Sequence, residues 1–273
     1  MPMLELHKKN TDELYDIIIL GGGVAGLAAA ITSGQQGLRV IVLEKAVFGG
    51  SVAVLESVSG YPGIEKIGGW ELTQTMVRQA KEVGCELIDS NEVVGIRKLE
   101  NRTFEIKSSD GNQLRARSVI ITTGGEPRLL GLEDELRFAQ HGIHTCAQCA
   151  GSRYQGKNVA VAGNGIWAVE AALHLLSLGC EVTFITGDSE LHGNLFLIKK
   201  LVSHIQFHFL AGYHVTGLRG EEYLEEIDVV ALHTKEIKRI EVAAVFVYRG
   251  IVPNIKIVAA QQDANGFLLV NEN

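Results

Sequence analysis

The chain has 273 residues, of which 46% are hydrophobic, and it carries a formal net charge of -7 at pH 7. This length and composition predict a folded protein with one large domain or two ordinary ones, and 31 glycines against four prolines argue against a disordered tract. Because the net charge is negative and no long run of lysine and arginine offsets it, we expect no nucleic acid partner.

The N-terminal segment mixes charges of both signs and contains no apolar stretch followed by a small-residue cleavage site. The most apolar run, residues 17–31, is interrupted by glycines and is too short to span a bilayer. We therefore expect a cytoplasmic protein with no membrane partner. Most thiols are kept reduced in that compartment, so a persistent structural disulfide is the weakest interpretation of a cysteine pair.

The first predicted strand covers residues 15–20, an apolar run rich in β-branched side chains. A glycine-rich turn follows, and residues 27–37, "LAAAITSGQQG", contain helix formers and end in glycine, which predicts a helix. A second apolar run over residues 39–43 ends at Glu44. This order of strand, glycine turn, helix, strand and acid is typical of a βαβ dinucleotide-binding unit.

Each residue of this motif has a predicted physical role. Gly21 permits the tight turn, Gly23 lets the backbone approach a pyrophosphate, and Gly26 lets the helix pack closely on the strand. The N-terminus of the helix offers N–H groups and a positive dipole end to the phosphates. We expect Glu44 to bind the hydroxyl pair of a ribose.

The stretch "HTCAQCAG" holds a pair of cysteines, Cys146 and Cys149, separated by two residues. Such a pair can form a metal knuckle, a structural disulfide or a redox-active dithiol. With His141 and His144 it offers four zinc ligands, but structural zinc sites normally use two separated two-ligand knuckles. Four ligands within nine residues are too crowded, so zinc is the weaker alternative to a redox pair.

The first βαβ pattern recurs in "NVAVAGNGIWAVEAALHLLSLGCEVTFIT", where Gly163 and Gly165 take the places of Gly21 and Gly23. Two such units in one chain predict two Rossmann-like domains. The two remaining cysteines, Cys85 and Cys180, occupy equivalent helix-to-strand junctions, and we expect them to be small buried apolar residues rather than reactive thiols.

The second copy is altered where a cofactor would touch it. Trp167 replaces Ala25, which places an indole near the turn that would hold a pyrophosphate, and Thr186 replaces Glu44. No arginine follows to bind a 2′-phosphate. The fold is therefore expected to persist while nicotinamide binding is impaired. The alternative is that Trp167 turns aside and Asp188 binds the ribose.

The chain resembles the low-molecular-weight thioredoxin reductases, flavoproteins in which a pyridine-nucleotide domain is inserted into an FAD domain. The resemblance runs nearly from end to end, through "IIILGGGVAGLAAA", "FGGSVAVLESVSGYPG", "GGWEL", "RSVIITTGGEPRLLGL", "CAQCAG", "VAVAGNGIWAVEAA" and "VFVYRGIVPN". It implies an α/β fold with two Rossmann-like, three-layer dinucleotide-binding domains. The FAD-binding domain would comprise residues 1–126 and 250–273, and the inserted domain, residues 127–249, would carry the cysteine pair.

The resemblance also implies functional residues. The FAD-binding positions would be Gly21, Gly23, Ala25, Gly26, Glu44, Gly49, Gly50, Ser51, Thr123 and Gly124. Cys146 and Cys149 match the redox pair at the start of a helix, whose N–H groups lower a thiol pKa. In this family the second cysteine, here Cys149, faces the flavin, and the first, here Cys146, attacks a thioredoxin-like protein substrate. The family further implies a homodimer and a rotation between domains, with hinges near residues 124–125 and 250.

Three departures from the family bear on function. Ala150 replaces the aspartate that commonly donates a proton, so we expect protons to come from water, His141 or His144. The cluster "HRRxxxR", which grips NADPH, is replaced by "ITGDSELHG", so NADPH is not the expected donor. The chain stops at "GFLLVNEN", before the closing Gly-Asp segment of the family, so we expect the C-terminal part of the FAD domain to be incomplete.

Three hypotheses follow. The first is a thioredoxin reductase-like enzyme whose electron donor is not NADPH, with ferredoxin as the candidate because a branch of the family uses it and flavin accepts single electrons. The basic residues Lys235, Lys238 and Arg239 could meet such an acidic carrier, although such a cluster is more often a solvated face. The second is an NAD(P)H-dependent disulfide reductase with atypical contacts. The third is a redox-sensing flavoprotein without turnover.

Overall fold

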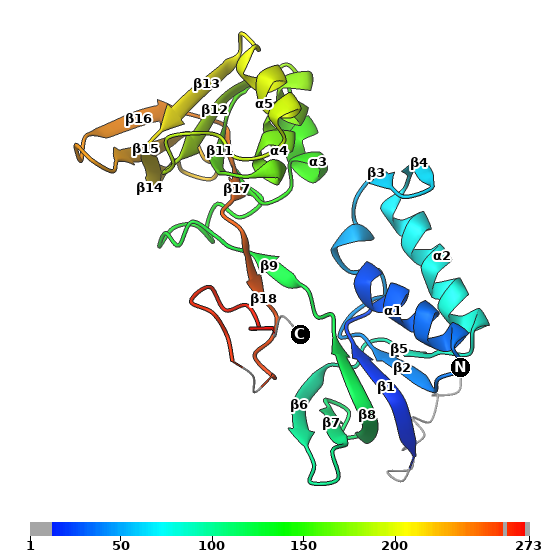
Figure 1. Ribbon diagram of the computed structural model, residues 1–273. Coiled ribbons are helices and arrows are strands. Elements are labelled where there is room, and N and C mark those ends of the chain that lie inside the picture. Colours follow the sequence, from blue (N-terminus) through cyan, green and yellow to red (C-terminus); the bar gives the residue numbers. More distant parts are fainter. Residues whose placement is uncertain (1–12, 259–260, 271–273) are drawn as a thin grey trace. The chain divides into compact units, whose positions relative to one another are not determined.

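The computed structural model describes residues 13–258 and 261–270 (Figure 1). The chain divides into two compact units, Met1–Gly125 with Pro253–Asn273, and Glu126–Val252. Each unit is described by itself. None of the helices in the described ranges is both long enough and apolar enough to cross a membrane.

The sheet of the first unit has the strand order β5-β2-β1-β8-β7-β6. Strands β5, β2, β1 and β8 run parallel, and β7 and β6 continue the sheet antiparallel. The strands are β1 (Leu14–Leu20), β2 (Val40–Leu43), β5 (Glu86–Ile88), β6 (Val93–Lys98), β7 (Phe104–Ser108) and β8 (Gln113–Ile121). The other elements are α1 (Val24–Gln35), η1 (Gly50–Val52), the hairpin of β3 (Val58–Tyr61) and β4 (Ile64–Ile67), and α2 (Gly69–Glu82).

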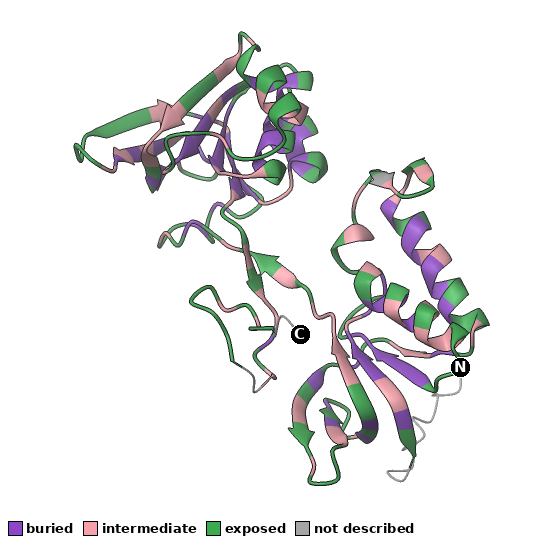
Figure 2. Cartoon of the chain, in the orientation of Figure 1, coloured by how far each residue is buried: buried purple, intermediate pink, exposed green. Residues whose placement is uncertain are grey.

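Successive residues of β1 enter two different cores, because side chains alternate between the faces of a strand. Ile19 packs with Leu27 of α1 and Met76 of α2. Ile18 faces the other way and packs with Ile106 of β7. Both faces of the parallel strands are covered, which explains why they read as continuous apolar runs (Figure 2).

The second unit contains a parallel sheet of order β10-β17-β11-β12-β13 and an antiparallel sheet of order β14-β15-β16. The parallel strands are β10 (Ile143–His144), β11 (Asn158–Gly163), β12 (Glu181–Thr186), β13 (Phe207–Ala211) and β17 (Ala244–Tyr248). The antiparallel strands are β14 (Tyr213–Arg219), β15 (Glu226–Ala231) and β16 (Ile237–Glu241). The helices are α3 (Ala147–Ala150), η2 (Gly151–Tyr154), α4 (Ile166–Ser177) and α5 (Leu195–Val202).

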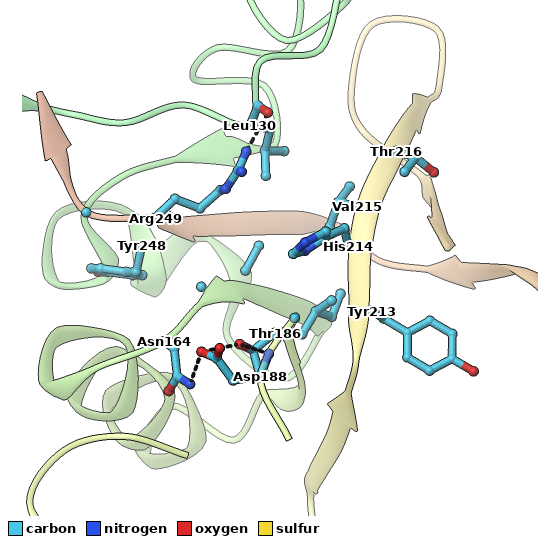
Figure 3. A pocket seen from close by; sticks show the side chains of 15 residues that line it. Leu130, Asn164, Thr186, Asp188, Tyr213, His214, Val215, Thr216, Tyr248 and Arg249 are labelled. Atoms are coloured by element: carbon cyan, nitrogen blue, oxygen red, sulfur yellow. Dashed lines mark hydrogen bonds between the residues drawn. The ribbon is translucent and has the colours of Figure 1, made fainter. Parts of the chain in front are cut away.

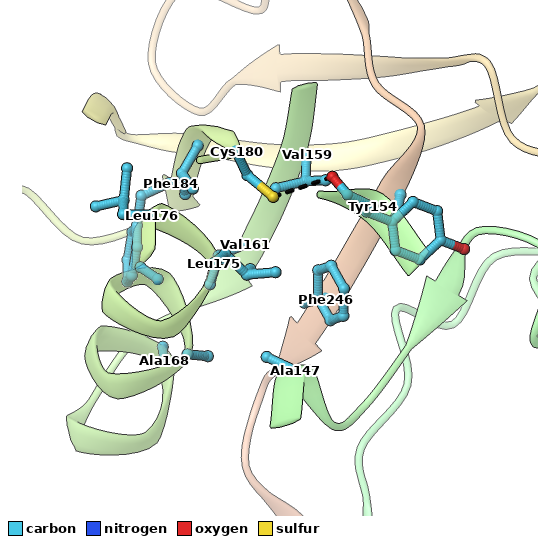
Figure 4. Close-up of a cluster of buried hydrophobic side chains, with 14 of the residues drawn as sticks. Ala147, Tyr154, Val159, Val161, Ala168, Leu175, Leu176, Cys180, Phe184 and Phe246 are labelled. Atoms are coloured by element: carbon cyan, nitrogen blue, oxygen red, sulfur yellow. Dashed lines mark hydrogen bonds between the residues drawn. The ribbon is translucent and has the colours of Figure 1, made fainter. Parts of the chain in front are cut away.

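The second unit has three layers. On one face of the parallel sheet, Val161 and Phe246 pack with Leu175 of α4 (Figure 4). On the other face, Ala160 packs with Ile227 of the antiparallel sheet. The expected α/β fold with Rossmann-like units is therefore confirmed. The segments that join the units, β9 (Gly125–Pro127) and β18 (Ile251–Pro253), pair as a two-stranded sheet.

Candidate functional site

The turn between β1 and α1 depends on two glycines that no larger residue could replace without a backbone shift. Gly21 has a φ of 102°, and a Cβ added there would lie 2.3 Å from the carbonyl oxygen of Thr122. A Cβ on Gly26 would lie 2.0 Å from the carbonyl oxygen of Gly21. The tight turn and the close contact of α1 with the strand are as predicted.

Gly23 differs, because its φ of -74° suits any residue. The nearest heavy atom to a Cβ added there is Gly50 Cα, at 3.9 Å. The missing side chain therefore leaves space beside the N-terminus of α1, where no side chain caps the helix. Gly49 forms an isolated β-bridge with Gly23, so backbone lines this space from two segments. The arrangement fits the pyrophosphate of a dinucleotide.

Glu44 lies at the end of β2, directly beside this turn. It is 8% exposed, and its carboxylate accepts hydrogen bonds from the N–H groups of Gly22, at 2.7 Å, and Ala46, at 2.9 Å. These bonds hold the acid at the carboxyl edge of the sheet. A ribose of a dinucleotide on the turn would lie at this edge.

The remaining residues of the predicted FAD site lie on the same unit. Ala25 and Ser51 are exposed. Thr123 and Gly124 follow β8, and their carbonyl oxygens accept hydrogen bonds from the side chain and the backbone N–H of Asn254. Sequence reasoning missed Thr122, whose hydroxyl donates to the carbonyl oxygens of Leu20 and Gly21 and so supports the turn from a strand about one hundred residues away.

Cys146 and Cys149 form a disulfide bond with Cα atoms 5.4 Å apart. Cys146 is the N-cap of α3, and its Sγ accepts a hydrogen bond from the N–H of Cys149 at 3.2 Å. The pair therefore lies at the start of a helix, as predicted. The zinc alternative is not supported, because both sulfurs are bonded to each other and His144 is hydrogen-bonded to a tyrosine.

His144 was expected as one candidate proton source beside water and His141, and its surroundings do not favour that role. His144 is 4% exposed, and its Nε2 lies 2.7 Å from the hydroxyl of Tyr154. Burial, with a smaller contribution from Arg153, lowers the pKa of His144 to about 4. The ring is therefore neutral at neutral pH. His141 is exposed and stacks on Tyr223, and its role as a proton donor stays a prediction.

Sequence reasoning also missed Tyr248, at the end of β17. Its hydroxyl accepts a hydrogen bond from the N–H of Ala147, which lies between the two cysteines, at 2.9 Å. The only sequence signal for this contact is the position of the tyrosine at the end of a predicted strand, and this signal does not identify the partner.

The second unit contains a cavity of about 590 Å³. Figure 3 shows the side chains that line it. It lies at the carboxyl ends of β11, β12 and β17, where ligands bind in open α/β sheets, and its far wall is β14. Its lining includes Gly163, Asn164, Thr186, Asp188, His214 and Tyr248. The size suits a nucleotide. The polar groups at its edge decide what it can hold.

Asn164 occupies the second glycine turn with its own side chain. Its Oδ1 accepts the N–H groups of Gly165 and His192, both at 2.9 Å. Its Nδ2 donates to Asp188 Oδ2 at 2.7 Å and to the carbonyl oxygen of Glu190 at 2.9 Å. The N–H of Gly165 is therefore not available to a phosphate, and the loop of residues 187–193 is tied to the turn (Figure 3).

This loop also lies against the start of α4. A Cβ added to Gly193 would be 3.3 Å from Ile166 Cα and 3.4 Å from Ile166 N. Trp167, one residue further, is 59% exposed. The structure thus adds an obstruction at the pyrophosphate position that the sequence did not indicate, formed by Asn164 and the loop.

The charge at this turn is negative. The hydrogen bond from Asn164 is the largest influence that lowers the pKa of Asp188, so its carboxylate is ionised at neutral pH. Arg249 also lines the cavity, but its Nη1 donates to the carbonyl oxygen of Leu130 at 2.6 Å. Arg249 is exposed and keeps its positive charge, so the edge of the cavity carries charges of both signs.

The basic residues on and near β16 do not form a free positive patch. Arg239 Nε lies 3.2 Å from Asp228 Oδ1 and 3.6 Å from Glu226 Oε2. Lys238 Nζ lies 3.9 Å from Glu236 Oε1. Acidic neighbours pair with Arg239 and Lys238, which favours the solvated-face interpretation.

The chain matches one protein family and known thioredoxin reductases over most of its length. The family described as pyridine nucleotide-disulphide oxidoreductase matches residues 15–273. The thioredoxin reductase of Ureaplasma parvum is 32% identical over 264 residues, which cover 96% of this chain and 84% of that protein. The Bacillus subtilis enzyme of the same name is 29% identical, covering 89% and 76%.

Solved structures match both units. The thioredoxin reductase of Lactococcus lactis has a TM-score of 0.84 and 25% identity, and the match covers 94% of this chain and 85% of that one. The thioredoxin reductase of T. acidophilum has a TM-score of 0.82 and 27% identity, covering 95% and 85%.

Proposed function

Because the chain belongs to the pyridine nucleotide-disulphide oxidoreductase family, we propose that Cys146 and Cys149 pass electrons to a thioredoxin-like protein and that the electron donor is not NADPH. The chain is an FAD-dependent disulfide oxidoreductase of the thioredoxin reductase type.

FAD, when bound, supplies a redox centre that exchanges one or two electrons. The first unit is proposed as the FAD-binding domain. The open space beside Gly23 would receive the pyrophosphate, with the N–H groups of α1 directed at it. Glu44 would orient the ribose, while the segment Gly49–Ser51 and the turn at Thr123 and Gly124 would line the rest of the site.

The cysteine pair performs thiol–disulfide exchange in its reduced form. The thiolate of Cys146 attacks the disulfide of the partner, and one partner thiolate leaves and is protonated. Cys149 then attacks the mixed disulfide, releases the second partner thiol and restores the bond to Cys146. The partner disulfide gains two electrons and two protons. The N–H of Cys149, which already points at Cys146 Sγ, would stabilise the attacking thiolate.

The closed second glycine turn is the observation that carries the donor proposal. Asn164 accepts the N–H of Gly165 with its own side chain, and Asp188, in the segment that replaces the basic NADPH-binding cluster of the family, accepts a hydrogen bond from Asn164. We name a reduced ferredoxin as the candidate donor, since flavin accepts single electrons. The basic residues on β16 are paired with acidic neighbours, so the proposal does not rest on that cluster.

An anaerobic titration tests the donor. The protein is reconstituted with FAD, and bleaching of the flavin absorbance is followed after addition of NADPH, NADH or photoreduced ferredoxin. We expect ferredoxin to bleach the flavin rapidly and NADPH to do so at least a hundredfold more slowly. Rapid bleaching by NADPH would defeat the donor proposal.

A second assay tests the cysteine roles. Cys146→Ser and Cys149→Ser should each keep FAD binding but abolish reduction of thioredoxin, because each half of the exchange needs its own sulfur. Cys180→Ser is the matched control, since that thiol is free and buried in a hydrophobic core of the same unit and should leave turnover unchanged. Turnover by either single variant would contradict the assignment.

The cavity favours one alternative. Its size of about 590 Å³ would admit a nucleotide, so an NAD(P)H-dependent reductase with atypical contacts is the second candidate. Bleaching by NADH in the same titration would establish it. Flavin binding without turnover from any donor would favour a redox sensor instead.

We further propose a homodimer, which the resemblance to the family implies. Sedimentation velocity of the FAD-loaded protein at micromolar concentration is expected to give about twice the mass of 29.6 kDa. A single species of monomer mass would contradict this.

A further inference from the structure

Tyr248 lies beside the redox-active segment because of the strand register. β10 pairs with β17 in parallel, with Ile143 opposite Val245 and His144 opposite Phe246. Continuing this register by two residues places Tyr248 level with Cys146. β10 ends at His144, so at the level of Tyr248 the strand β17 pairs only with Gly163 of β11, and the redox-active segment follows on the other side.

The hydroxyl of Tyr248 reaches the first turn of α3. It accepts the N–H of Ala147 at 2.9 Å. Among the described residues, no other side chain outside the segment forms a hydrogen bond with the backbone of residues 146–149. The other bonds of this turn are internal, from the Cys149 N–H to Cys146 Sγ and from the Ala150 N–H to the carbonyl oxygen of Cys146.

The second glycine turn holds Tyr248 in place. Gly163 is its register partner on β11, and a Cβ on Gly163 would lie 2.0 Å from the carbonyl oxygen of Tyr248. Burial is the main cause that raises the pKa of Tyr248, with a further contribution from Glu170. The phenol therefore stays neutral, and it can accept the N–H of Ala147 while keeping its own proton.

The two redox states depend on this contact to different degrees. In the oxidised state the Cys146–Cys149 bond itself holds the turn. In the dithiol state that covalent link is gone, and hydrogen bonds alone keep the Cys149 N–H directed at Cys146 Sγ. A tether on Ala147 therefore contributes more to the reduced state than to the oxidised state.

We propose that Tyr248 is a positioning residue for the redox-active turn, holding Ala147 in place so that the Cys149 N–H continues to face Cys146 after the disulfide opens. This inference rests on the proposed redox role of the pair. It adds a residue from a strand about one hundred positions away, and it assigns that residue to the stability of the dithiol.

The test is the equilibrium between the protein disulfide and dithiothreitol at pH 7, measured on the FAD-loaded full chain. In this exchange dithiothreitol gives up two electrons and two protons, becomes a cyclic disulfide and leaves the protein as a dithiol. Tyr248→Phe keeps the ring and removes the acceptor. We expect its equilibrium constant to fall about three- to tenfold toward the protein disulfide.

Tyr154→Phe is the matched control. It removes a hydroxyl from the same side of the unit, one that contacts His144 and not the segment of residues 146–149. Its equilibrium constant should stay within about twofold of that of the wild-type protein. FAD content and far-UV circular dichroism check that both variants are folded.

Hydrogen exchange of the Ala147 amide in the reduced protein gives a second readout. We expect exchange to be about tenfold faster in Tyr248→Phe than in the wild-type protein. An unchanged equilibrium constant together with unchanged exchange would overturn the inference. If dithiothreitol cannot open the wild-type disulfide at all, the proposed redox pair itself fails, and this result is distinguishable from a wild-type pair that cycles without help from Tyr248.

Discussion

Asn164 and Asp188 illustrate how two side chains change what a glycine turn can bind. The backbone of the second turn keeps its glycines, but Asn164 satisfies the N–H of Gly165 and anchors an ionised carboxylate beside it. A phosphate would lose that hydrogen bond and meet like charge. These two contacts support the proposal that NADPH is not the donor.

Asp188→Asn should strengthen NADPH binding two- to fivefold, and the gain should be larger at low salt, because the exposed carboxylate is screened by ions. An asparagine there still accepts the Asn164 hydrogen bond, so only the charge changes. Fluorescence titration with NADPH measures the effect. Glu190→Gln, an equal charge change in the same loop outside the cavity lining, should change the affinity less. Equal affinities for wild type and Asp188→Asn in dilute buffer would contradict the electrostatic argument.

His144 is a second case in which one side chain's surroundings decide its chemistry. It is 4% exposed and packs against the tilted rings of Tyr154 and Phe246, whose centroids are 5.3 and 5.5 Å away. Its pKa of about 4 lies below the value of 6.5 that it has when unfolded. The folded state therefore binds fewer protons between these two values.

Because of His144, the stability of the folded protein depends on pH. Stability from neutral His144 is fully present above pH 6.5 and is lost as the pH falls toward 4, because the unfolded state takes up the proton first. We expect the free energy of unfolding to fall by about 3 kcal/mol across that range. Urea unfolding at a series of pH values measures it.

The controls separate this group from the others. His144→Gln should show a smaller decline between pH 6.5 and 4, whereas His233→Gln, in an exposed turn, should decline like the wild-type protein. If all three proteins lose stability in parallel, His144 is not the source of the pH dependence.

At the scale of elements, α1 and α4 have the same strand–turn–helix context but differ in the space available at their N-termini. Both follow a parallel strand and a glycine turn, and both begin at a glycine N-cap. The space beside Gly23 is open to a ligand, whereas the loop of residues 187–193 lies against the start of α4. The position of a neighbouring loop, rather than the helix itself, separates the two.

Two alanine substitutions in α1 and its turn should therefore behave differently. Gly26→Ala forces a Cβ against the Gly21 carbonyl and should destabilise the protein by about 1 to 3 kcal/mol. Gly23→Ala fits its backbone and meets nothing nearer than 3.9 Å, so the FAD-free protein should keep its stability but bind FAD at least tenfold more weakly. Urea unfolding without FAD and a flavin titration measure both. Wild-type FAD affinity in Gly23→Ala would remove the pyrophosphate from this turn.

At the scale of the whole molecule, each unit has its own hydrophobic cores and its own buried free thiol. Cys85 belongs to the first unit and donates to the carbonyl oxygen of Ala30. Cys180 belongs to the second and donates to the carbonyl oxygen of Tyr154. Burial raises the pKa of both thiols, so each reacts only when its surroundings open.

The alkylation rates of these two thiols would show which unit binds FAD. In a Cys146→Ser, Cys149→Ser background, FAD at about one hundred times its Kd should slow alkylation of Cys85 by up to a hundredfold, because a ligand stabilises the structure that binds it. Alkylation of Cys180 should slow less. Mass spectrometry of the labelled peptides measures both rates, and equal protection of the two thiols would contradict the assignment of FAD to the first unit.

Several features were predictable because they follow from local rules. The glycine turn before α1, the cysteine pair at the start of a helix and the burial of Cys85 and Cys180 are confirmed. The burial of His144 and the ion pairs of Arg239 were not predicted, since they depend on tertiary contacts with Tyr154 and Asp228. The roles proposed for individual residues at the FAD site stay predictions.

The sequence by itself determined the two βαβ units and their glycine turns, because periodicity and turn chemistry act over a few residues, and its motifs carried the resemblance to the family. Only the tertiary structure decided that Asn164 closes the second turn and that Tyr248 supports Ala147, 101 positions away. The physical reason is that a hydrogen bond needs its two atoms within about 3 Å. Residues distant in the chain reach that separation only after parallel strands align in register.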